Sequence, residues 1–259
     1  MSDASSSTPR AAVILAAGQG KRMKSALPKV LHEVAGKPML ARVLAVAREA
    51  GCDPVVAVIG HGAPRVRSAF RDSGLLWAEQ REQRGTGHAL AQAAEALGSE
   101  PRIVLVLSGD VPLLRAATLA RLVEAAIEGW GAMAVATLPE PGRLGRVIAR
   151  SDGSLDRIVE AADATADELA IRRVNAGLYA LPSPELFSFL SRLRPTNAQG
   201  ELYLTDAIGD AVKAGRRVAL VELDDPDEAL GVNDREDLAR VERLALATDS
   251  RRQLHEGSD

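Results

Sequence analysis

Residues 15–29, with the sequence LAAGQGKRMKSALPK, combine the residue types that a nucleoside triphosphate requires of its binding loop. The small residues at its start allow backbone N–H groups to approach phosphate oxygens closely. The cations Lys21, Arg22 and Lys29 follow in the same loop and can neutralise those oxygens. An apolar run at residues 11–16 precedes the loop directly, which favours phosphate binding over a flexible, solvated turn.

Two better-known phosphate loops do not fit this segment. The Walker A motif requires Ser or Thr after Gly-Lys, whereas Gly20-Lys21 is followed by Arg22. The dinucleotide-binding motif requires a third glycine at the place where Met23 stands. We therefore predict a triphosphate site of another class.

Short apolar runs alternate with amphipathic stretches in the first half of the chain. Strands are predicted at residues 11–16, 54–60 and 102–107, and helices at residues 38–49, 86–97 and 115–128. Runs that are apolar throughout indicate a parallel sheet covered on both faces, and the strand–helix–strand order implies right-handed crossovers. We predict an α/β fold of three layers, with a sheet between two layers of helices.

The second half is richer in predicted strands. They lie at residues 133–138, 145–149, 155–160, 173–181 and 217–223, with a hairpin turn at Asp152-Gly153. Helices are predicted at 204–214 and 234–247, the second opened by an acidic cap. We expect these strands to extend the same sheet and to form the second wall of a cleft. Residues 10–247 would then form one domain, between a disordered tail at 1–9 and a C-terminal tail at 248–259.

The phosphate-type loop and Asp110 each follow a predicted parallel strand. Ligands bind beyond the carboxyl ends of such strands in open α/β sheets, so position alone nominates both. Taken singly, Asp110 could equally cap a turn before Pro112, and Asn233 could simply begin the last helix. Gln80 could be an ordinary exposed polar residue.

Composition narrows the classes of partner and location. The chain has 259 residues, with 32 Lys and Arg against 35 Asp and Glu, and a net charge of -3 gives no reason to expect nucleic acid or an anionic membrane as a partner. No apolar run reaches the length of a membrane helix, and the polar start lacks the apolar core of a signal peptide. One cysteine, Cys52, excludes an internal disulfide. These features predict a cytoplasmic protein.

The motifs together resemble the sugar-nucleotide pyrophosphorylases, a nucleotidyltransferase family. The pattern L-A-A-G-x-G-x-R-M followed by L-P-K is the signature of that family and stands at residues 15–29. Further matching segments follow in the family's order: PKVL at 28–31, AGKP at 35–38, GHG at 60–62, QRGTGHA at 83–89, GDVPL at 109–113, QGELYLTD at 199–206 and GVN at 231–233. The resemblance covers residues 11–246 and is strongest to the uridyltransferase domain of the bifunctional N-acetylglucosamine-1-phosphate uridyltransferase/glucosamine-1-phosphate acetyltransferases.

The resemblance implies a Rossmann-like nucleotide-diphospho-sugar transferase fold with a mixed, mainly parallel sheet, so that residues 10–247 would be the nucleotidyltransferase domain. It implies an enzyme that makes a UDP-sugar from UTP and a sugar 1-phosphate, above all N-acetylglucosamine 1-phosphate, with release of pyrophosphate. Mg²⁺ would be the cofactor, and the product would serve cell-wall precursor biosynthesis.

The resemblance also implies a role for each matching position. Catalysis would rest on Arg22 and Lys29. Nucleotide binding would involve Leu15, Ala16, Ala17, Gly18, Lys29, Gln80, Gly85, Thr86 and Gly109, with Gln80, Gly85 and Thr86 reading the uracil. The sugar would contact Gly145, Glu160 and Asn175. Mg²⁺ would be held by Asp110 and Asn233, whose oxygens are the hard ligands that this ion prefers.

Three positions depart from the family pattern. Ser108 stands where Tyr is typical, Ala162 where Lys is typical and Ala176 where Thr is typical. We expect Ser108 near the nucleotide and the sugar phosphate, and both alanines close to the sugar side, so these changes bear on the sugar more than on the reaction type. The chain also ends shortly after the last predicted helix. The β-helix domain that carries acetyl transfer and trimerisation in the bifunctional relatives is therefore expected to be absent.

Two alternatives stay open at the level of sequence. The same fold could act on another nucleoside triphosphate, or on another sugar 1-phosphate such as glucose 1-phosphate. The chain could instead be a non-catalytic, nucleotide-binding regulatory protein, although the joint presence of Arg22, Lys29, Asp110 and Asn233 argues for catalysis. The sequence leaves the oligomeric state open.

Overall fold

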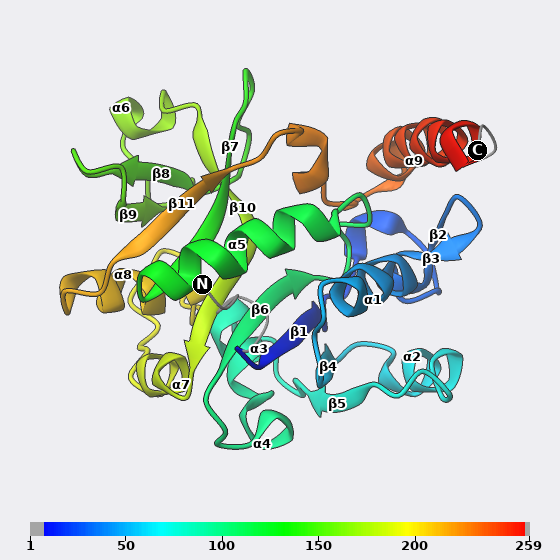
Figure 1. The fold of residues 1–259 in the computed structure, drawn as a ribbon, viewed down its shortest axis with the longest axis horizontal. Coiled ribbons are helices and arrows are strands. Elements are labelled where there is room, and N and C mark those ends of the chain that lie inside the picture. Colours follow the sequence, from blue (N-terminus) through cyan, green and yellow to red (C-terminus); the bar gives the residue numbers. More distant parts are fainter. Residues whose placement is uncertain (1–7, 257–259) are drawn as a thin grey trace, which may run out of the picture.

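The structure is a computed structural model that describes residues 8–256, with side chains through Asp249. The predicted tails at 1–9 and 248–259 therefore fall partly outside the described residues, at 1–7 and 257–259. The described chain forms a mixed sheet between layers of helices (Figure 1). None of the helices in this part of the chain combines the length and the apolar character needed to cross a bilayer.

The sheet has the strand order β11-β7-β10-β6-β1-β4-β5. These strands are β1 Arg10–Ala16, β4 Val55–Ile59, β5 Leu76–Glu79, β6 Arg102–Ser108, β7 Gly131–Thr137, β10 Arg173–Ser183 and β11 Val218–Glu222. Neighbours are parallel, except that β10 is antiparallel to both β6 and β7. A hairpin of β8 Arg146–Ala149 and β9 Leu155–Val159 joins the sheet through β10. The predicted α/β fold with a mixed, mainly parallel sheet is confirmed.

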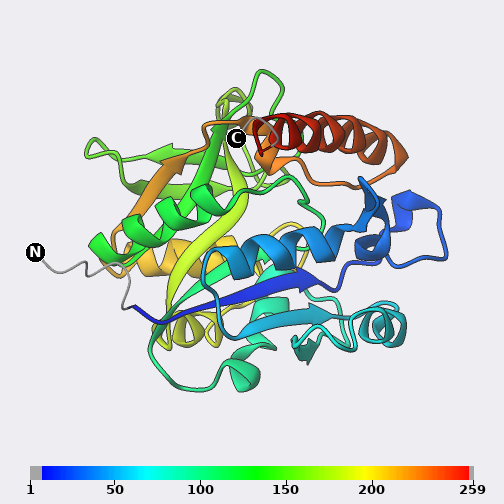
Figure 2. The same ribbon diagram turned by 45° about the vertical axis from the view of Figure 1, so that its right-hand side comes forward.

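Two layers of helices cover the sheet. The helices are α1 Met39–Glu49, α2 Ala63–Ala69, α3 Thr86–Ala91, α4 Ala94–Leu97, α5 Ala116–Glu128, α6 Ala166–Leu169, α7 Glu185–Leu190, α8 Leu204–Lys213 and α9 Arg235–Glu256. Ala12 and Ile14 of β1 pack in one core with α1 and α5, whereas Ala11 and Val13 pack in the opposite core with α3, α7 and α8. Figures 1 and 2 show α1 and α5 together on one face of the sheet. Burial on both faces therefore explains why β1 is apolar throughout.

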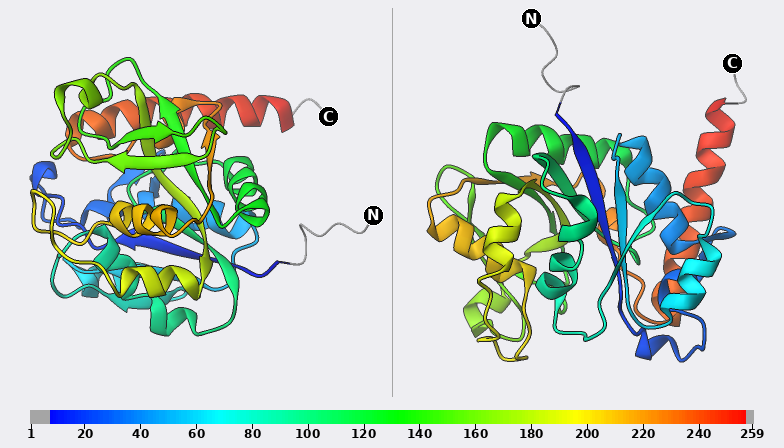
Figure 3. Two further views of the ribbon diagram at one scale, coloured as in Figure 1. Left: turned by 90° about the vertical axis from the view of Figure 1, so that its left-hand side faces the viewer. Right: turned by 90° about the horizontal axis from the view of Figure 1, so that it is seen from below.

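Shorter elements complete the chain and frame its loops. They are the 3-10 helices η2 Lys21–Met23, η3 Lys29–Leu31 and η4 Pro226–Ala229, and the paired strands β2 Glu33–Val34 and β3 Lys37–Pro38. The β8–β9 hairpin packs against α8, and Figure 3 shows the two elements side by side. The second half, with the antiparallel strand β10 and the β8–β9 hairpin, thus lies beside the parallel strands of the first half.

The last helix is tied to the loop after β1. Val241 and Ala245 of α9 share a buried cluster with Met23. The carboxylate of Glu242 accepts a hydrogen bond of 2.8 Å from the backbone N–H of Ala35, between β2 and β3. Figure 2 shows α9 lying across this end of the molecule. These contacts hold α9 against the loop after β1 and against the turn between β2 and β3.

Some element boundaries differ from the sequence-based prediction. The helix expected at 86–97 is divided into α3 and α4, because the N–H groups of Gln92 and Ala93 bond to carbonyls three residues back. The helix expected to end at 247 continues as α9 to Glu256, since neither Gly nor Pro interrupts it before Gly257. The sequence analysis predicted no counterpart for the short elements β2, β3, β5, α2, α6, α7, η2, η3 and η4. The strand β5 has four residues and lies at the sheet edge, too short to show a clear period.

Candidate functional site

Three residues that are far apart in the sequence meet at one edge of the sheet. The ammonium group of Lys29 forms an ion pair with Asp110 and donates a hydrogen bond of 3.2 Å to Asn233 Oδ1. Lys29 lies 81 positions from Asp110 and 204 positions from Asn233. The side chains of Lys29 and Asp110 are 11% and 25% exposed, so the group is accessible yet largely shielded from water. The structure thus brings one predicted catalytic residue together with both predicted metal ligands.

The parallel pairing of β1 with β6 explains this meeting. Leu15 is paired with Ser108, and the Gly109 N–H donates to the Leu15 carbonyl at 2.9 Å. The loops that follow β1 and β6 therefore begin at the same edge of the sheet. The Val232 N–H donates in turn to the backbone carbonyl of Asp110 at 2.9 Å. This bond brings the segment before α9 to the same edge.

Asn233 is held with its amide oxygen toward Lys29. Its Nδ2 donates to the Gly231 carbonyl at 3.2 Å, and its backbone N–H donates to Asp237 Oδ2 at 2.8 Å. Asp234 Oδ1 accepts from the N–H groups two and three residues further on, both at 3.0 Å. The predicted acidic cap of the last helix is therefore confirmed, and it anchors the residue beside it.

The loop after β1 requires glycine at one position for a steric reason. Gly20 has a φ of +60°, and a Cβ placed on it would lie 2.8 Å from Lys29 Cβ. Gly18 is exposed, and nothing lies within 4 Å of its Cβ position. Arg22, on η2, is exposed as well, and within the described residues no hydrogen bond or ion pair engages its guanidinium group. The structure therefore places Lys29, but not Arg22, against the acidic residue.

A pocket of about 290 Å³ opens beside this loop, where β4 and β5 end. Its lining residues are Gln19, Gly60, His61, Glu79, Gln80, Arg81 and Gln83. A Cβ on Gly60 would lie 2.9 Å from the Gln80 carbonyl and 3.0 Å from the Ala17 carbonyl, so the ends of three strands approach too closely for a side chain. Of the predicted nucleotide residues, Leu15 and Ala16 end β1 and lead into this region.

Gln80 is buried at the floor of this pocket, with 4% of its surface exposed. Its Nε2 donates to the Gly85 carbonyl at 3.0 Å and lies 3.1 Å from His88 Nδ1. These contacts orient the carboxamide, which is the requirement for reading a base edge. The reading of Gln80 as an exposed polar residue is therefore wrong.

Gln83 lines the same pocket and was not singled out from the sequence. Its Nε2 donates to the Ala17 carbonyl at 2.7 Å and joins the loop after β5 to the loop after β1. Thr86 Oγ1 accepts from the Leu204 N–H at 3.1 Å, and Gly85, with a φ of +101°, lies against the backbone just before α8. The segment at 83–89 thus links this pocket to the second half of the chain.

Gly145, Glu160 and Asn175 meet on the antiparallel side. The Asn175 N–H donates to the Gly145 carbonyl at 2.9 Å, and Glu160 Oε2 lies 3.3 Å from the Cβ position of Gly145. Glu160 Oε1 accepts a hydrogen bond of 2.8 Å from Thr205 Oγ1. All three predicted sugar-binding residues are therefore brought together. Thr205 joins them, and its sequence signal was only its place in the motif at 199–206.

The carboxyl group of Glu160 has a raised pKa. Burial raises its pKa above the usual range, because the charged form loses hydration. The hydrogen bond from Thr205 opposes this change, while the charges of Asp206 and Asp163 raise the pKa further. A buried carboxylate of this kind gains from any hydroxyl donor that a ligand brings to it.

The three departures from the family pattern fall in different surroundings. Ser108 ends β6 beside Asp110, and Ala162 is exposed shortly after β9. Ala176 is 6% exposed and packs in the core on the α1 and α5 face. The expectation that Ala176 lies close to the sugar side is wrong, because alternate residues of β10 point to opposite faces and Ala176 points away from the face of Asn175.

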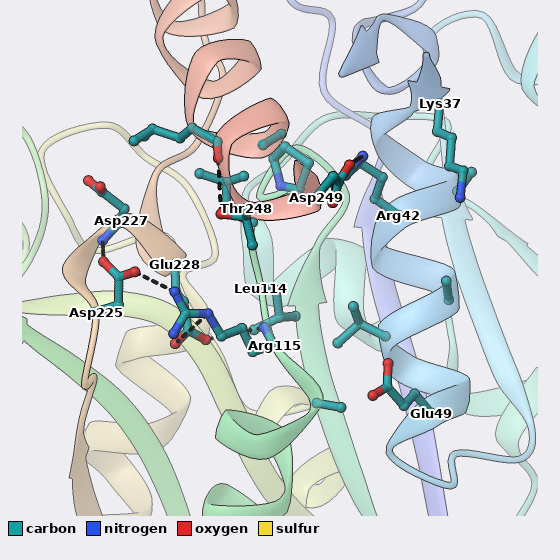
Figure 4. Close-up of a pocket in the computed structure, with 18 residues that line it drawn as sticks. Lys37, Arg42, Glu49, Leu114, Arg115, Asp225, Asp227, Glu228, Thr248 and Asp249 are labelled. Atoms are coloured by element: carbon teal, nitrogen blue, oxygen red, sulfur yellow. Dashed lines mark hydrogen bonds and ion pairs between the residues drawn. The ribbon is translucent and has the colours of Figure 1, made fainter. Parts of the chain in front are cut away.

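A larger pocket of about 510 Å³ lies elsewhere, between α1, the start of α5, η4 and α9 (Figure 4). Two arginines in its wall are already paired, Arg42 with Asp249 and Arg115 with Asp225. The pocket shares no lining residue with the 290 Å³ pocket and contains none of the predicted site residues. We therefore place the candidate site at the sheet edge.

Residues 12–200 match the family model described as the MobA-like NTP transferase domain. The chain is 49% identical over 247 residues to the Bifunctional protein GlmU of Chromobacterium violaceum, which covers 95% of this chain and 53% of that protein. It is 48% identical over 233 residues to the Bifunctional protein GlmU of Burkholderia multivorans, which covers 90% of this chain and 51% of that protein. The chain thus spans about half the length of these curated relatives.

A solved structure has the same fold. The crystal structure of UDP-glucose pyrophosphorylase complexed with UDP-glucose aligns with a TM-score of 0.73 at 18% sequence identity. The alignment covers 93% of this chain and 99% of that chain. The resemblance predicted from the motifs is confirmed by the relatives, and the fold class is confirmed by this structure.

Proposed function

The chain belongs to the MobA-like NTP transferase domain family, and from this membership we propose that it makes a UDP-sugar from UTP and a sugar 1-phosphate, most readily N-acetylglucosamine 1-phosphate. Pyrophosphate would be the second product. The similarity to the GlmU proteins over nearly the whole chain and the motif at residues 15–29 support this choice. The reaction would take place in the cytoplasm and supply cell-wall precursor synthesis.

One observation carries the proposal: Lys29, Asp110 and Asn233 converge from three separate segments at the open edge of the sheet. A cation, a carboxylate and an amide oxygen are the groups that a metal-bound triphosphate requires. The loop after β1 lies directly beside them and offers backbone N–H groups for phosphate oxygens.

The oxygens of Asp110 and Asn233 suit Mg²⁺. Both are hard donors, and both already face a single positive charge, the ammonium of Lys29. Asp110 and Asn233 would hold the ion, which supplies charge neutralisation to the triphosphate when bound. Few protein ligands suffice, because Mg²⁺ keeps several waters and takes phosphate oxygens as further ligands.

The reaction would be an in-line transfer. An oxygen of the sugar 1-phosphate attacks the α-phosphorus of UTP, a new P–O bond forms, and the bond to the bridging oxygen breaks with its electron pair leaving on pyrophosphate. The attacking phosphate is already ionised at neutral pH, so no general base is needed. Lys29 and Arg22 would offset the negative charge that spreads over the phosphates.

The two substrates would occupy the two sides of the cleft. Uracil would lie in the 290 Å³ pocket against the oriented amide of Gln80. The sugar would lie against Glu160 and Asn175. A base that lacks the uracil pattern would set a polar edge against the oriented amide without forming the matching hydrogen bond, which is costly.

A substrate matrix tests the proposal. Pyrophosphate release is measured with Mg²⁺ for each of the four common ribonucleoside triphosphates against N-acetylglucosamine 1-phosphate, glucose 1-phosphate and other sugar phosphates. We expect the highest kcat/KM for UTP with N-acetylglucosamine 1-phosphate. Binding of UTP without pyrophosphate release for any sugar phosphate would instead indicate a regulatory nucleotide-binding protein.

A further inference from the structure

The hydroxyl group of the buried residue Tyr179 contacts the side-chain amide of Asn175. Asn175 Nδ2 donates a hydrogen bond of 2.6 Å to Tyr179 Oη, and Asn175 Oδ1 accepts one of 2.9 Å from the Gly177 N–H. A backbone N–H can only donate, so the oxygen of the carboxamide must face Gly177 and its nitrogen must face Tyr179. The two contacts fix the orientation of the amide.

An irregularity of β10 makes the contact possible. Residues four apart on a regular strand are separated by about 13 Å along the strand. The pairing of β10 with β7 shifts register between Asn175 and Tyr179, and Gly177 between them has a φ of +73°. Nothing lies within 4 Å of the Cβ position of Gly177, so its backbone conformation, not crowding, calls for glycine. The bend turns two side chains of one strand toward each other.

Tyr179 is a core residue. It is 5% exposed and packs in the cluster that includes Leu155 of β9 and Leu204 of α8. Burial raises the pKa of the Tyr179 hydroxyl above its usual range, and the nearby charge of Glu160 acts in the same direction. The hydroxyl therefore keeps its proton at neutral pH and meets Asn175 through its oxygen.

The fixed amide presents a defined pattern to a ligand. A carboxamide has two N–H donors and two acceptor lone pairs, and the internal contacts use one of each. Asn175 therefore offers one donor and one acceptor, while the carboxylate form of Glu160 only accepts. The acetamido group of an N-acetyl sugar has one N–H and one carbonyl oxygen, which complement the free positions of the amide.

We propose that Tyr179 is a positioning residue for the sugar 1-phosphate, which holds the Asn175 carboxamide in the orientation that binds an acetamido sugar and so contributes to selection among sugar 1-phosphates. This inference rests on the proposed function. Loss of the hydroxyl leaves the amide held only by Gly177, free to sample orientations in which donor and acceptor positions no longer match the ligand.

The test is Tyr179→Phe, which removes only the hydroxyl. We expect KM for N-acetylglucosamine 1-phosphate to rise by about fivefold to tenfold, the range for one lost hydrogen bond, while KM for UTP stays within about twofold. The preference for this substrate over glucose 1-phosphate, measured as the ratio of kcat/KM values, should fall by a similar factor.

A matched control separates positioning from general loss of packing. Trp130 is also a buried aromatic residue, 9% exposed, and its Nε1 donates to Glu185 Oε2 at 2.7 Å, near the other end of β7. Trp130→Phe likewise removes one hydrogen bond from a core aromatic, and should leave both KM values unchanged. In the background Asn175→Ala, Tyr179→Phe should have no further effect on the sugar KM.

The outcomes are distinguishable. An inactive wild-type chain rejects the proposed function itself. An active wild-type chain with unchanged sugar KM and selectivity in Tyr179→Phe overturns the positioning role alone. Equal effects of Tyr179→Phe in the presence and absence of the Asn175 amide would also overturn it, because they would assign the change to packing.

Discussion

On the proposed nucleotide side of the site, strand ends approach one another closely at Gly60 and Gly109, whereas on the proposed sugar side Glu160, Asn175 and other polar residues meet through their side chains. The first arrangement follows from parallel strands that end at a common edge. The second follows from antiparallel strands and a bend in β10.

The difference indicates which side tolerates change. Where a glycine lies against a neighbouring strand end or against Lys29, the close approach depends on the absence of a side chain, so nearly any substitution at that glycine disturbs it. A site lined by side chains can be altered one hydrogen bond at a time. We therefore expect changes on the nucleotide side to affect turnover or the choice of nucleotide, and changes on the sugar side to affect mainly the selection and binding of the sugar. Five variants test this comparison.

Lys29→Ala and Asp110→Ala should give the largest effects. Each removes one member of the ion pair at the sheet edge, and kcat should fall by at least about a hundredfold, the usual result of losing one preorganised charge contact. The measurement is steady-state pyrophosphate release, with circular dichroism to confirm folding. Near wild-type turnover in both variants would remove the basis of the proposed function.

Gly20→Ala should have the next largest effect. The new Cβ would meet Lys29 Cβ at 2.8 Å and would also be forced into a φ of +60°, so kcat/KM should fall by about tenfold or more. Gly153→Ala is the matched control: its φ is +79° in the β8–β9 turn, with nothing within 4 Å. It should lower the thermal midpoint while leaving kcat/KM near that of the wild type. Equal activity losses in both variants would contradict the steric role of Gly20.

Gln80→Leu should change the choice of nucleotide. The variant keeps an apolar stem in a buried position but removes the oriented amide, so the preference for UTP over CTP should fall by about tenfold or more. Competition assays with both nucleotides measure the ratio, and KM for the sugar 1-phosphate serves as the internal control. An unchanged ratio would assign base selection to other residues.

Thr205→Val should give the smallest effect, confined to the sugar side. The hydroxyl stabilises the ionised form of Glu160, so its loss raises the Glu160 pKa beyond the increase that burial already causes. In the proposed function, the carboxylate is the form that would accept hydrogen bonds from the sugar. In the pH profile of kcat/KM for the sugar 1-phosphate, the acid limb should therefore move to higher pH. At pH values above that limb, kcat/KM should be about threefold lower than in the wild type. A shift to lower pH would contradict the assigned hydrogen bond.

The fold was largely predictable where its signals are local. The strands β1, β4 and β6 appear in the sequence as uninterrupted apolar runs because they are buried on both faces. The division between α3 and α4 was missed because a change to hydrogen bonds three residues back leaves no mark in an Ala-rich sequence, and β5 was missed because four residues are too few to show a period. The end of α9 was placed too early, because its continuation carries polar helix-forming residues with no apolar period.

In the candidate site too, local sequence signals predict some contacts, and only the folded structure shows the others. The contact between Lys29 and Asp110 could be anticipated, because the loops that follow two paired parallel strands begin at the same edge of the sheet. The contacts of Gln83, Thr205 and Tyr179 could not, because each joins side chains or loops whose separation is set by the folded sheet. Ala176 was misplaced for the same reason: only the register of β10 shows which face it occupies.

Residue order alone was sufficient for the layered α/β architecture, the strand–loop–cation motif and the family, since apolar period and residue type express themselves locally. Which polar groups meet, which carboxyl is buried and which way an amide faces depended on the three-dimensional arrangement. Hydrogen bonds are directional and act over about 3 Å, so their partners are decided by tertiary packing that places residues 45 or 81 positions apart within reach of one another.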